Sequence, residues 1–223
     1  MAHALGADAI ELDAKLSADG EVVIMHDSSL DRTTNGRGSV GAHSLEELKR
    51  LDAGSRFSEE YSVTRIPTLR EVLTELATKL LVNVEMTNYA NPLDRLPEAV
   101  AALVKEIGVE NKVLLSSFNP IALLRARRLV PTTSLGLLVG EVQPSWQRLV
   151  FRVLIPYHAY HPFDTIFRAS DISTSHKRGR RVHVWTVNSE RRIREIFHAG
   201  ADGVITDVPD VARRVADEPK PSS

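Results

Sequence analysis

The sequence predicts an α/β fold in one domain, and three observations support it. Short apolar runs alternate with segments of helical period along most of the chain. Two similar segments, GADAIELD at residues 6–13 and GADGVITD at 200–207, each place a glycine just before a strand-like run. The length of 223 residues is enough to bury one sizeable core. Strands that alternate with helices pair in parallel, which predicts a TIM-type (β/α)8 barrel.

Eight segments are predicted to be strands because they are short, apolar and bounded by turn residues. They are residues 9–16, 22–26, 81–87, 113–118, 134–139, 158–161, 181–187 and 203–206. Asp19-Gly20 is a hairpin turn between the first two, so the second strand should run antiparallel to the first. The other seven strands are of the parallel type.

Seven segments have the apolar spacing of helices. They are residues 45–51, 68–77, 96–107, 120–129, 145–153, 164–178 and 190–199. The segment 28–67 is rich in turn residues and is expected to be a loop-rich insertion between a strand and a helix. We expect residues 1–216 to form the single barrel domain and residues 217–223 to form a disordered tail.

The first residues are expected to be the end of a helix. A predicted helix runs into Gly200, a residue that commonly ends helices, and a strand follows. By analogy, MAHAL at residues 1–5 should be the last turn of a helix, and one turn does not overcome the cost of nucleation alone. We therefore expect this chain to lack the first strand and most of the first helix of the barrel.

The composition of the chain argues against several classes of binding partner and metal site. The formal net charge is −1 with dispersed charges, which predicts no nucleic-acid partner, and the absence of cysteine excludes disulfides and zinc–thiolate sites. No apolar run reaches the roughly 18 residues of a membrane span, so no stable membrane insertion is expected. The run RLVFRVLIPYHAYHP, residues 148–162, is compatible with a membrane-touching patch, but a buried barrel segment is the preferred interpretation. A cytoplasmic location is expected.

Acidic side chains occur at alternating positions in two of the predicted strands. Glu11 and Asp13 share one face of the first strand, and Glu85 shares a face with Asn83 and Thr87. Carboxylates that converge at the strand ends repel each other unless a cation neutralises them. Oxygen ligands favour a hard divalent cation, Mg²⁺ or Ca²⁺. His26, at the end of the next strand, is suited to proton transfer near neutral pH.

The acids, Trp185 and the histidines also have simpler, structural interpretations that compete with an active site. A lone acid in a strand is commonly a solvated group, and Trp185 by default fills a core, although its place near a strand end also allows it to wall a pocket. Four other histidines show no partner pattern and are expected to be structural or on the surface. These are His43, His176, His183 and His198.

The chain resembles the glycerophosphodiester phosphodiesterases. The most specific match is GADAIELDAKLSADGEVVIMHDSSLDRTTNGRG, and the likeness continues through SLEELKRLDAG, IPTLREVL, VNVEMTNY, VLLSSFNP, YHP, VHVWTVN and GADGVITDVPD. These motifs cover nearly the whole chain in the family's order. The resemblance implies a barrel of the phospholipase-C-like phosphodiesterase type. It further implies metal-dependent hydrolysis of a small-molecule glycerophosphodiester to an alcohol and glycerol 3-phosphate.

The resemblance also implies residue roles. Glu11, Asp13 and Glu85 match the family's metal ligands, His26 matches one of two catalytic histidines, and Trp185 matches the tryptophan beside the substrate. Thr87 stands where many members have lysine. The family's His-Arg-Gly strand, with a second histidine, a phosphate-contacting arginine and another acid, would precede Met1, so impaired activity is expected for the chain as printed.

Two alternatives stay open from the sequence. The first is a catalytically inactive, incomplete barrel that at most binds a phospho-ligand. The second is a phosphodiesterase of the same barrel type that acts on lysophospholipids or sphingomyelin, because the same metal ligands serve either substrate. The alcohol group, the choice between Mg²⁺ and Ca²⁺ and the oligomeric state do not follow from the residues.

Overall fold

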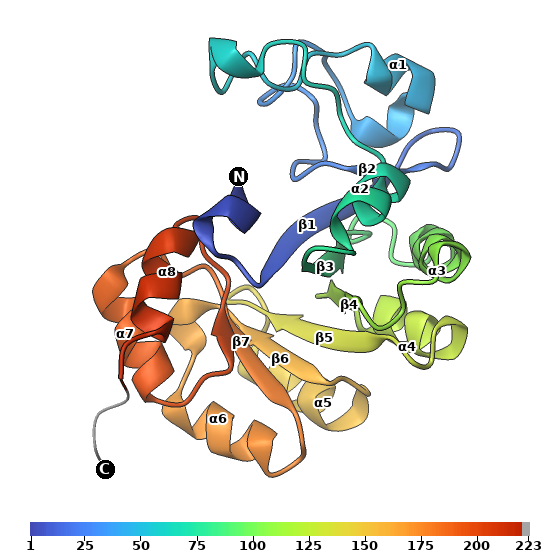
Figure 1. Cartoon of the computed structure of the whole chain (residues 1–223). Coiled ribbons are helices and arrows are strands. Elements are labelled where there is room, and N and C mark those ends of the chain that lie inside the picture. Colours follow the sequence, from blue (N-terminus) through green and yellow to red (C-terminus); the bar gives the residue numbers. More distant parts are fainter. Residues whose placement is uncertain (220–223) are drawn as a thin grey trace.

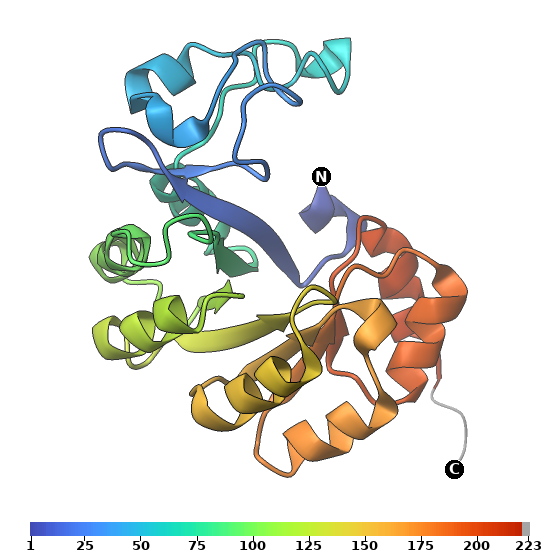
Figure 2. The same ribbon diagram turned by 180° about the vertical axis from the view of Figure 1, so that it is seen from behind.

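The structure, a computed structural model, describes residues 1–219 and contains one curled sheet with helices along its outer side (Figures 1 and 2). The strand order is β2-β1-β3-β4-β5-β6-β7-β8. The strands are β1 (Ala9–Leu16), β2 (Val22–Ile24), β3 (Leu81–Met86), β4 (Val113–Ser117), β5 (Ser134–Val139), β6 (Ala159–Pro162), β7 (Arg181–Val184) and β8 (Gly203–Val204). The strands β1 and β3 to β8 are parallel, and β2 pairs antiparallel with β1. This half-barrel confirms the predicted fold class.

The helices follow the strands in alternation, as the sequence predicts. They are α1 (Leu45–Lys49), α2 (Leu69–Leu76), α3 (Leu96–Ile107), α4 (Pro120–Leu129), α5 (Ser145–Leu154), α6 (Ala169–His176), α7 (Glu190–His198) and α8 (Pro209–Ala216). Four short 3-10 helices accompany them: η1 (Ala2–Leu5), η2 (Val40–Ala42), η3 (Glu59–Tyr61) and η4 (Asp164–Ile166). The helical turn expected in MAHAL is η1, and Gly6 ends it with a φ of 85°.

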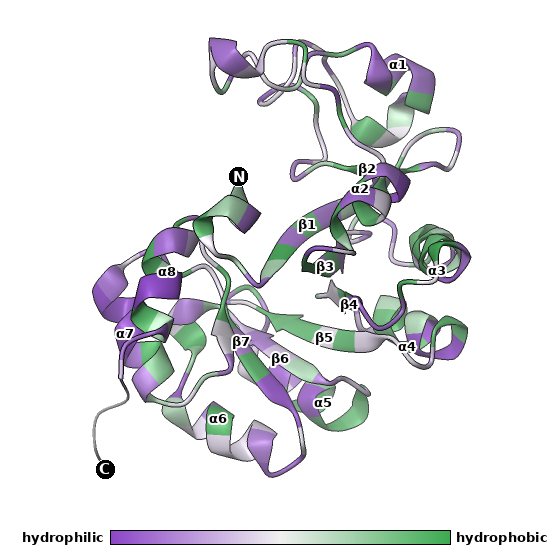
Figure 3. Ribbon diagram, viewed as in Figure 1, coloured by the Kyte–Doolittle hydropathy of each residue, from purple (hydrophilic) through white to green (hydrophobic). Residues whose placement is uncertain are grey.

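The main core lies between the outer face of the sheet and the helices. Alternate residues of each strand contribute to it, among them Val82, Val84 and Met86 of β3, which are fully buried. Figure 3 shows apolar residues along β5, where five of the six positions are buried. Because successive side chains of a strand point to opposite faces, Asn83 and Glu85 of β3 point to the inner face. This alternation aims the polar groups at the barrel interior.

The segment 28–67 builds a small second core together with Val23 and Met25 of the β2 region, which makes it more than a flexible loop. Six buried apolar residues form this second cluster: Val23, Met25, Leu30, Val40, Leu48 and Ile66. Helix α1 inside the segment begins with a capping box, in which Ser44 accepts from the backbone of Glu47 and the Glu47 carboxylate accepts from Ser44. The segment stands beside β2 as a separate lobe (Figure 1).

One predicted helix is divided in the structure, and one helix was not predicted. The predicted helix 164–178 is divided into η4 and α6, because Arg168 has extended backbone angles and its N–H donates to the carboxylate of Asp171 at 3.0 Å. Helix α8 has no counterpart among the predicted helices. The predicted tail 217–223 remains a prediction: residues 220–223 lie outside the described part, and before them Glu218 pairs with Arg194 at 2.6 Å.

The apolar run 148–162 is divided between surface and core. Residues 159–162 are buried in β6, as the preferred interpretation predicts. By contrast, α5 has no fully buried residue, and Leu149, Val150, Val153 and Leu154 are exposed. The burial interpretation was therefore wrong for this helix, whose arginines rather than its leucines face the protein. Within residues 1–219, no helix has the length and apolarity needed to cross a bilayer.

Candidate active site and metal centre

The three acids singled out from the sequence converge on the inner face of the sheet. Asp13 of β1 stands opposite Glu85 of β3 in the parallel register, and Glu11 lies two residues earlier on β1. One carboxylate oxygen from each of the three lies within 4.8 Å of the others. This spacing allows one cation to contact all three side chains. The strand alternation therefore produces a cluster that can hold a metal ion.

The electrostatics of the cluster favour a cation. Glu11 is exposed on one side, but the protein around it desolvates the carboxylate and raises its pKa to about 8, and repulsion from Asp13 and Glu85 adds to the effect. Burial likewise raises the pKa of Glu85 to about 7, although a hydrogen bond from Tyr89 opposes the shift. The pKa of Asp13 is also raised by burial, against the attraction of His26 and Lys15. Carboxyl groups with raised pKa values take up a proton or a metal ion to relieve their repulsion.

His26 lies at the surface two residues after the end of β2. The N–H of Met25 donates to the carbonyl of Asp13 at 2.9 Å, so the chain delivers His26 beside the acidic cluster. The imidazole is exposed, and its Nδ1 lies 2.7 Å from Asp27, whose other carboxylate oxygen accepts from Arg32 at 2.6 Å. Hydrogen bonds from Arg32 and His26 lower the pKa of Asp27, which keeps it ionised. Because Nδ1 of His26 is engaged by Asp27, Nε2 is the ring nitrogen suited to proton transfer.

A lysine occupies the same face as the acids. Lys15 lies two residues after Asp13 on β1, and its Nζ donates to the hydroxyl of Thr87 at 2.6 Å. The Thr87 hydroxyl in turn donates to the carbonyl of Ala14 at 2.8 Å. Burial lowers the pKa of Lys15, while Asp13 and Glu85 oppose that shift. The site therefore contains one ammonium group held in place from two strands.

Aromatic rings form a wall beside the cluster. Tyr89 donates a hydrogen bond to Glu85, and its ring stacks edge-on against Phe118 at 5.6 Å between centroids. The ring centroids of Phe118 and Trp185 lie 5.4 Å apart, and those of Trp185 and Phe163 lie 4.9 Å apart. The indole N–H of Trp185 donates to the carbonyl of His161 at 2.9 Å, so the ring is fixed. Trp185 is half-buried and walls the site rather than filling the core.

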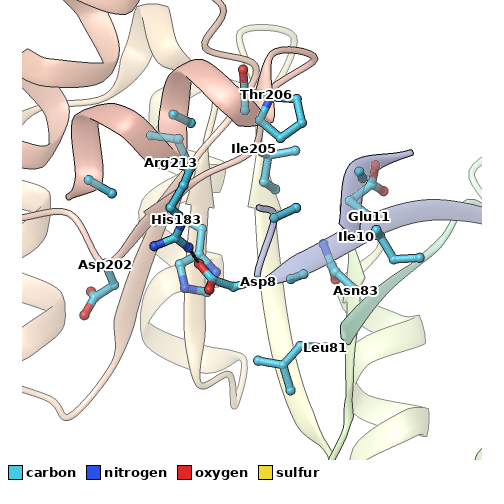
Figure 4. A pocket seen from close by; sticks show the side chains of 18 of the residues that line it. Asp8, Ile10, Glu11, Leu81, Asn83, His183, Asp202, Ile205, Thr206 and Arg213 are labelled. Atoms are coloured by element: carbon cyan, nitrogen blue, oxygen red, sulfur yellow. Dashed lines mark hydrogen bonds and ion pairs between the residues drawn. The ribbon is translucent and has the colours of Figure 1, made fainter. Parts of the chain in front are cut away.

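The cluster borders a cavity of about 560 Å³ that runs along the inner face between β1 and β8. Figure 4 shows Glu11 and Asn83 on one side of this cavity and His183 and Thr206 on the other. His183 approaches buried His161 with their ring nitrogens 3.1 Å apart. Burial lowers the pKa values of both histidines, which keeps them neutral. Within residues 1–219, strand β8 pairs only with β7, and β2 covers only the end of β1, so the cavity opens between β8 and the first half of β1.

The structure thus brings together the predicted acids, His26 and Trp185 on one side of the sheet, and it adds residues that the sequence reasoning passed over. Lys15 could have been found from its alternation with Asp13, and Tyr89 from its position four residues after Glu85. His183, expected to be structural or on the surface, lines the cavity beside His161. Their pairing depends on the neighbouring strands β6 and β7 and has no local signal.

The curled parallel sheet thus carries on its inner face a carboxylate cluster that could hold a metal ion. The sequence pattern of the glycerophosphoryl diester phosphodiesterase family matches residues 1–211. The chain belongs to this family and is a phosphoric diester hydrolase by its membership.

Relatives of known name agree with this assignment. The chain is 37% identical over 209 residues to a glycerophosphodiester phosphodiesterase of Caldanaerobacter subterraneus subsp. tengcongensis, covering 92% of this chain and 84% of that protein. It is 37% identical over 227 residues to one of Bacillus altitudinis, covering 98% and 91%. The structure of an Oleispira antarctica phosphodiesterase, in complex with the product sn-glycerol-3-phosphate, has a TM-score of 0.87 and 30% identity, covering 97% of this chain and 87% of that one.

Proposed function

We propose that the protein hydrolyses glycerophosphodiesters to an alcohol and glycerol 3-phosphate with a divalent cation, Mg²⁺ or Ca²⁺. The observation that carries the proposal is the convergence of Glu11, Asp13 and Glu85 within 4.8 Å beside an exposed histidine. Names of the relatives support the substrate class, and the glycerol 3-phosphate in the similar Oleispira antarctica structure supports the product.

The donor set fits a hard cation. All three side chains offer oxygen ligands, and desolvation, with repulsion between the carboxylates as a second cause, raises the pKa values of Glu11 and Glu85. A divalent charge would offset both effects. Such a cation, when bound, would polarise the phosphoryl oxygens and offset the negative charge that accumulates in the transition state. Glu11, Asp13 and Glu85 would hold it.

The remaining residues have distinct tasks in this proposal. His26 moves a proton through Nε2, and Asp27 fixes the imidazole by its hold on Nδ1. Lys15 presents its ammonium to a non-bridging phosphate oxygen, since Thr87 anchors it over the acidic cluster. The ring of Trp185 lies against the carbon atoms of the substrate, and its fixed orientation limits the width of the site.

Release of glycerol 3-phosphate from glycerophosphocholine tests the proposal. We expect turnover that requires Mg²⁺ or Ca²⁺, that stops when a chelator is added, and that resumes when the cation is restored. Glu85→Gln should lack this turnover, while Glu106→Gln, which changes an exposed acid paired with Arg70, should retain it. Equal turnover with and without the chelator would reject the metal-dependent mechanism. Cleavage of lysophosphatidylcholine but not of glycerophosphocholine would assign the substrate to lysophospholipids instead.

A further inference from the structure

Helix α5 places five of its six apolar residues on the solvent side, whereas Phe151 packs against the main core. Trp146, Leu149 and Leu154 are 68%, 64% and 70% exposed, and Val150 and Val153 are exposed beside them. These five residues, called the α5 face here, follow a spacing of three and four, so they lie on one side of the helix. Val142, 93% exposed, extends the face toward the preceding loop. A helix on a barrel normally buries such a face, so α5 has the reverse orientation.

The polar side of α5 is turned toward the protein. Arg148 donates to the carbonyls of Gly140 and Gln143 at 3.1 and 2.9 Å. Arg152 pairs with Asp171 at 2.6 Å and lies over the ring of Tyr160 at 4.3 Å. These contacts fix the rotation of the helix about its axis. The hydrogen bonds and ion pair of Arg148 and Arg152 therefore keep the α5 face directed toward solvent.

The surroundings of α5 are strongly basic. Residues 120–181, which run from α4 to the start of β7, contain ten Lys and Arg residues and three Asp and Glu residues, although the whole chain carries a net charge of −1. Arg128, Lys177 and Arg178 of this region are exposed. Helix α5 lies on the outer layer between α4 and α6 (Figures 1 and 2), and Figure 3 shows hydrophobic and hydrophilic residues together on it.

A cavity of about 440 Å³ lies behind the face, between α5 and the segment that leads into α6. Three arginines and one acid line it: Arg148, Arg152, Arg168 and Asp171. Guanidinium groups in a cavity of this size match a phosphate group in charge and geometry. The cavity therefore offers a site for an anionic phosphate group, and the neighbouring α5 face offers a site for the apolar chains of the same kind of molecule, a lipid.

We propose that the α5 face docks on the surface of an anionic lipid bilayer, with lipid phosphates entering the arginine-lined cavity behind it. An amphipathic helix with exposed Trp and Leu buries its apolar side at the boundary of head groups and acyl chains, and nearby basic residues add electrostatic attraction. A second copy of the chain fits less well, because a two-fold interface would bring this basic region against itself. The protein lies on the bilayer and does not cross it.

Docking would bring the active site near the lipid. Gly140 lies two residues before Val142, and a Cβ at Gly140 would stand 3.4 Å from Phe118 and 3.9 Å from Trp185. The apolar face thus begins beside the aromatic wall of the site. Access to diesters released from, or still held in, a bilayer is a consequence that rests on the phosphodiesterase function proposed above. Docking itself does not depend on that function.

Co-sedimentation of the whole protein with vesicles tests the docking. We expect binding to vesicles of phosphatidylcholine mixed with phosphatidylglycerol, weaker binding to phosphatidylcholine alone, and release by salt. The Trp146→Ser/Leu149→Ser variant should bind at least about tenfold more weakly, because two large apolar side chains no longer enter the bilayer. The matched control is Phe57→Ser/Leu93→Ser, which changes residues that are 81% and 71% exposed outside the face. Equal loss in both variants, or no binding by the unaltered protein, would overturn the proposal.

Fluorescence provides a second measurement. The chain has two tryptophans, so Trp185→Phe leaves Trp146 as the sole reporter. Its emission should shift to shorter wavelength with the anionic vesicles, and an unchanged spectrum would overturn the docking. Light scattering distinguishes self-association: a dimer that dissociates in Trp146→Ser/Leu149→Ser would assign the face to a second copy. Turnover of soluble glycerophosphocholine by that variant should equal the unaltered protein's, so failure of docking and failure of the proposed activity are separately visible.

Discussion

Lys15 and Thr87 join the first and second parallel strands across the acidic cluster, with Nζ of Lys15 donating to Oγ1 of Thr87 at 2.6 Å. Thr87 occupies the position at which the resemblance implies lysine in many relatives. The ammonium group is thus present at this site but comes from the neighbouring strand. Because both side chains point to the inner face, an ammonium group on either strand reaches the same region.

Exchange of the two residues tests this relationship. Lys15→Gln should lower kcat/KM for glycerophosphocholine by about 10- to 100-fold, the loss expected when a charge-assisted hydrogen bond to phosphate is removed. The Lys15→Gln/Thr87→Lys double variant should recover a large part of that loss, whereas Lys112→Gln, an exposed lysine, should leave turnover unchanged. A double variant no better than Lys15→Gln would show that the lysine must stand on β1.

Metal binding should stabilise the folded protein. A cation that binds the folded state alone raises the melting temperature by mass action, by about 2–4 °C for each kcal/mol in a chain of this size. Thermal melts with increasing Mg²⁺ or Ca²⁺ should show this rise in the unaltered protein and in Glu106→Gln. Glu85→Gln should melt higher without the cation, because one of three repelling carboxylates is gone, and should not respond to it. A full response in Glu85→Gln would contradict the ligand assignment.

The acidic cluster also predicts a pH dependence of stability. The folded protein raises the pKa of Glu11 from 4.5 to about 8 and of Glu85 from 4.5 to about 7. Between these limits the folded state binds more protons than the unfolded state, so the free energy of unfolding should fall as pH rises from about 4.5 to 8. Urea unfolding in a chelator should show this fall, and Glu11→Gln should show a shallower one. An equal slope in the variant would exclude Glu11 as its source.

Loss of the imidazole should affect catalysis and leave stability intact. His26→Gln should lower kcat by about 10²- to 10⁴-fold, as for removal of a general acid or base. Its melting temperature should stay near that of the unaltered protein, because the side chain is exposed. His43→Gln, at another loop histidine, is the matched control and should keep full turnover. Unchanged kcat in His26→Gln would remove His26 from the mechanism.

Local sequence patterns were enough to predict the order of the strands, of every described α-helix except α8, and the face of β1 and β3 that carries the acids. Both are local properties: apolar periodicity separates helix from strand, and alternation assigns Glu11, Asp13 and Glu85 to one side. Parallel pairing then followed from the alternation of elements, so the structure confirms the predicted fold class. Loop-rich composition also identified the segment 28–67, but not the second core that it forms with the β2 region.

Contacts between side chains that are distant in the sequence depend on how the elements pack, so they could not be predicted. The hydrogen bond between Lys15 and Thr87, the stacking of Tyr89 and Phe118, and the pairing of His161 with His183 all join different elements, so no spacing within one segment predicts them. The rotation of α5 is the clearest case. Its apolar spacing predicts an amphipathic helix, but the contacts of Arg148 and Arg152 with the barrel determine that the apolar side faces outward.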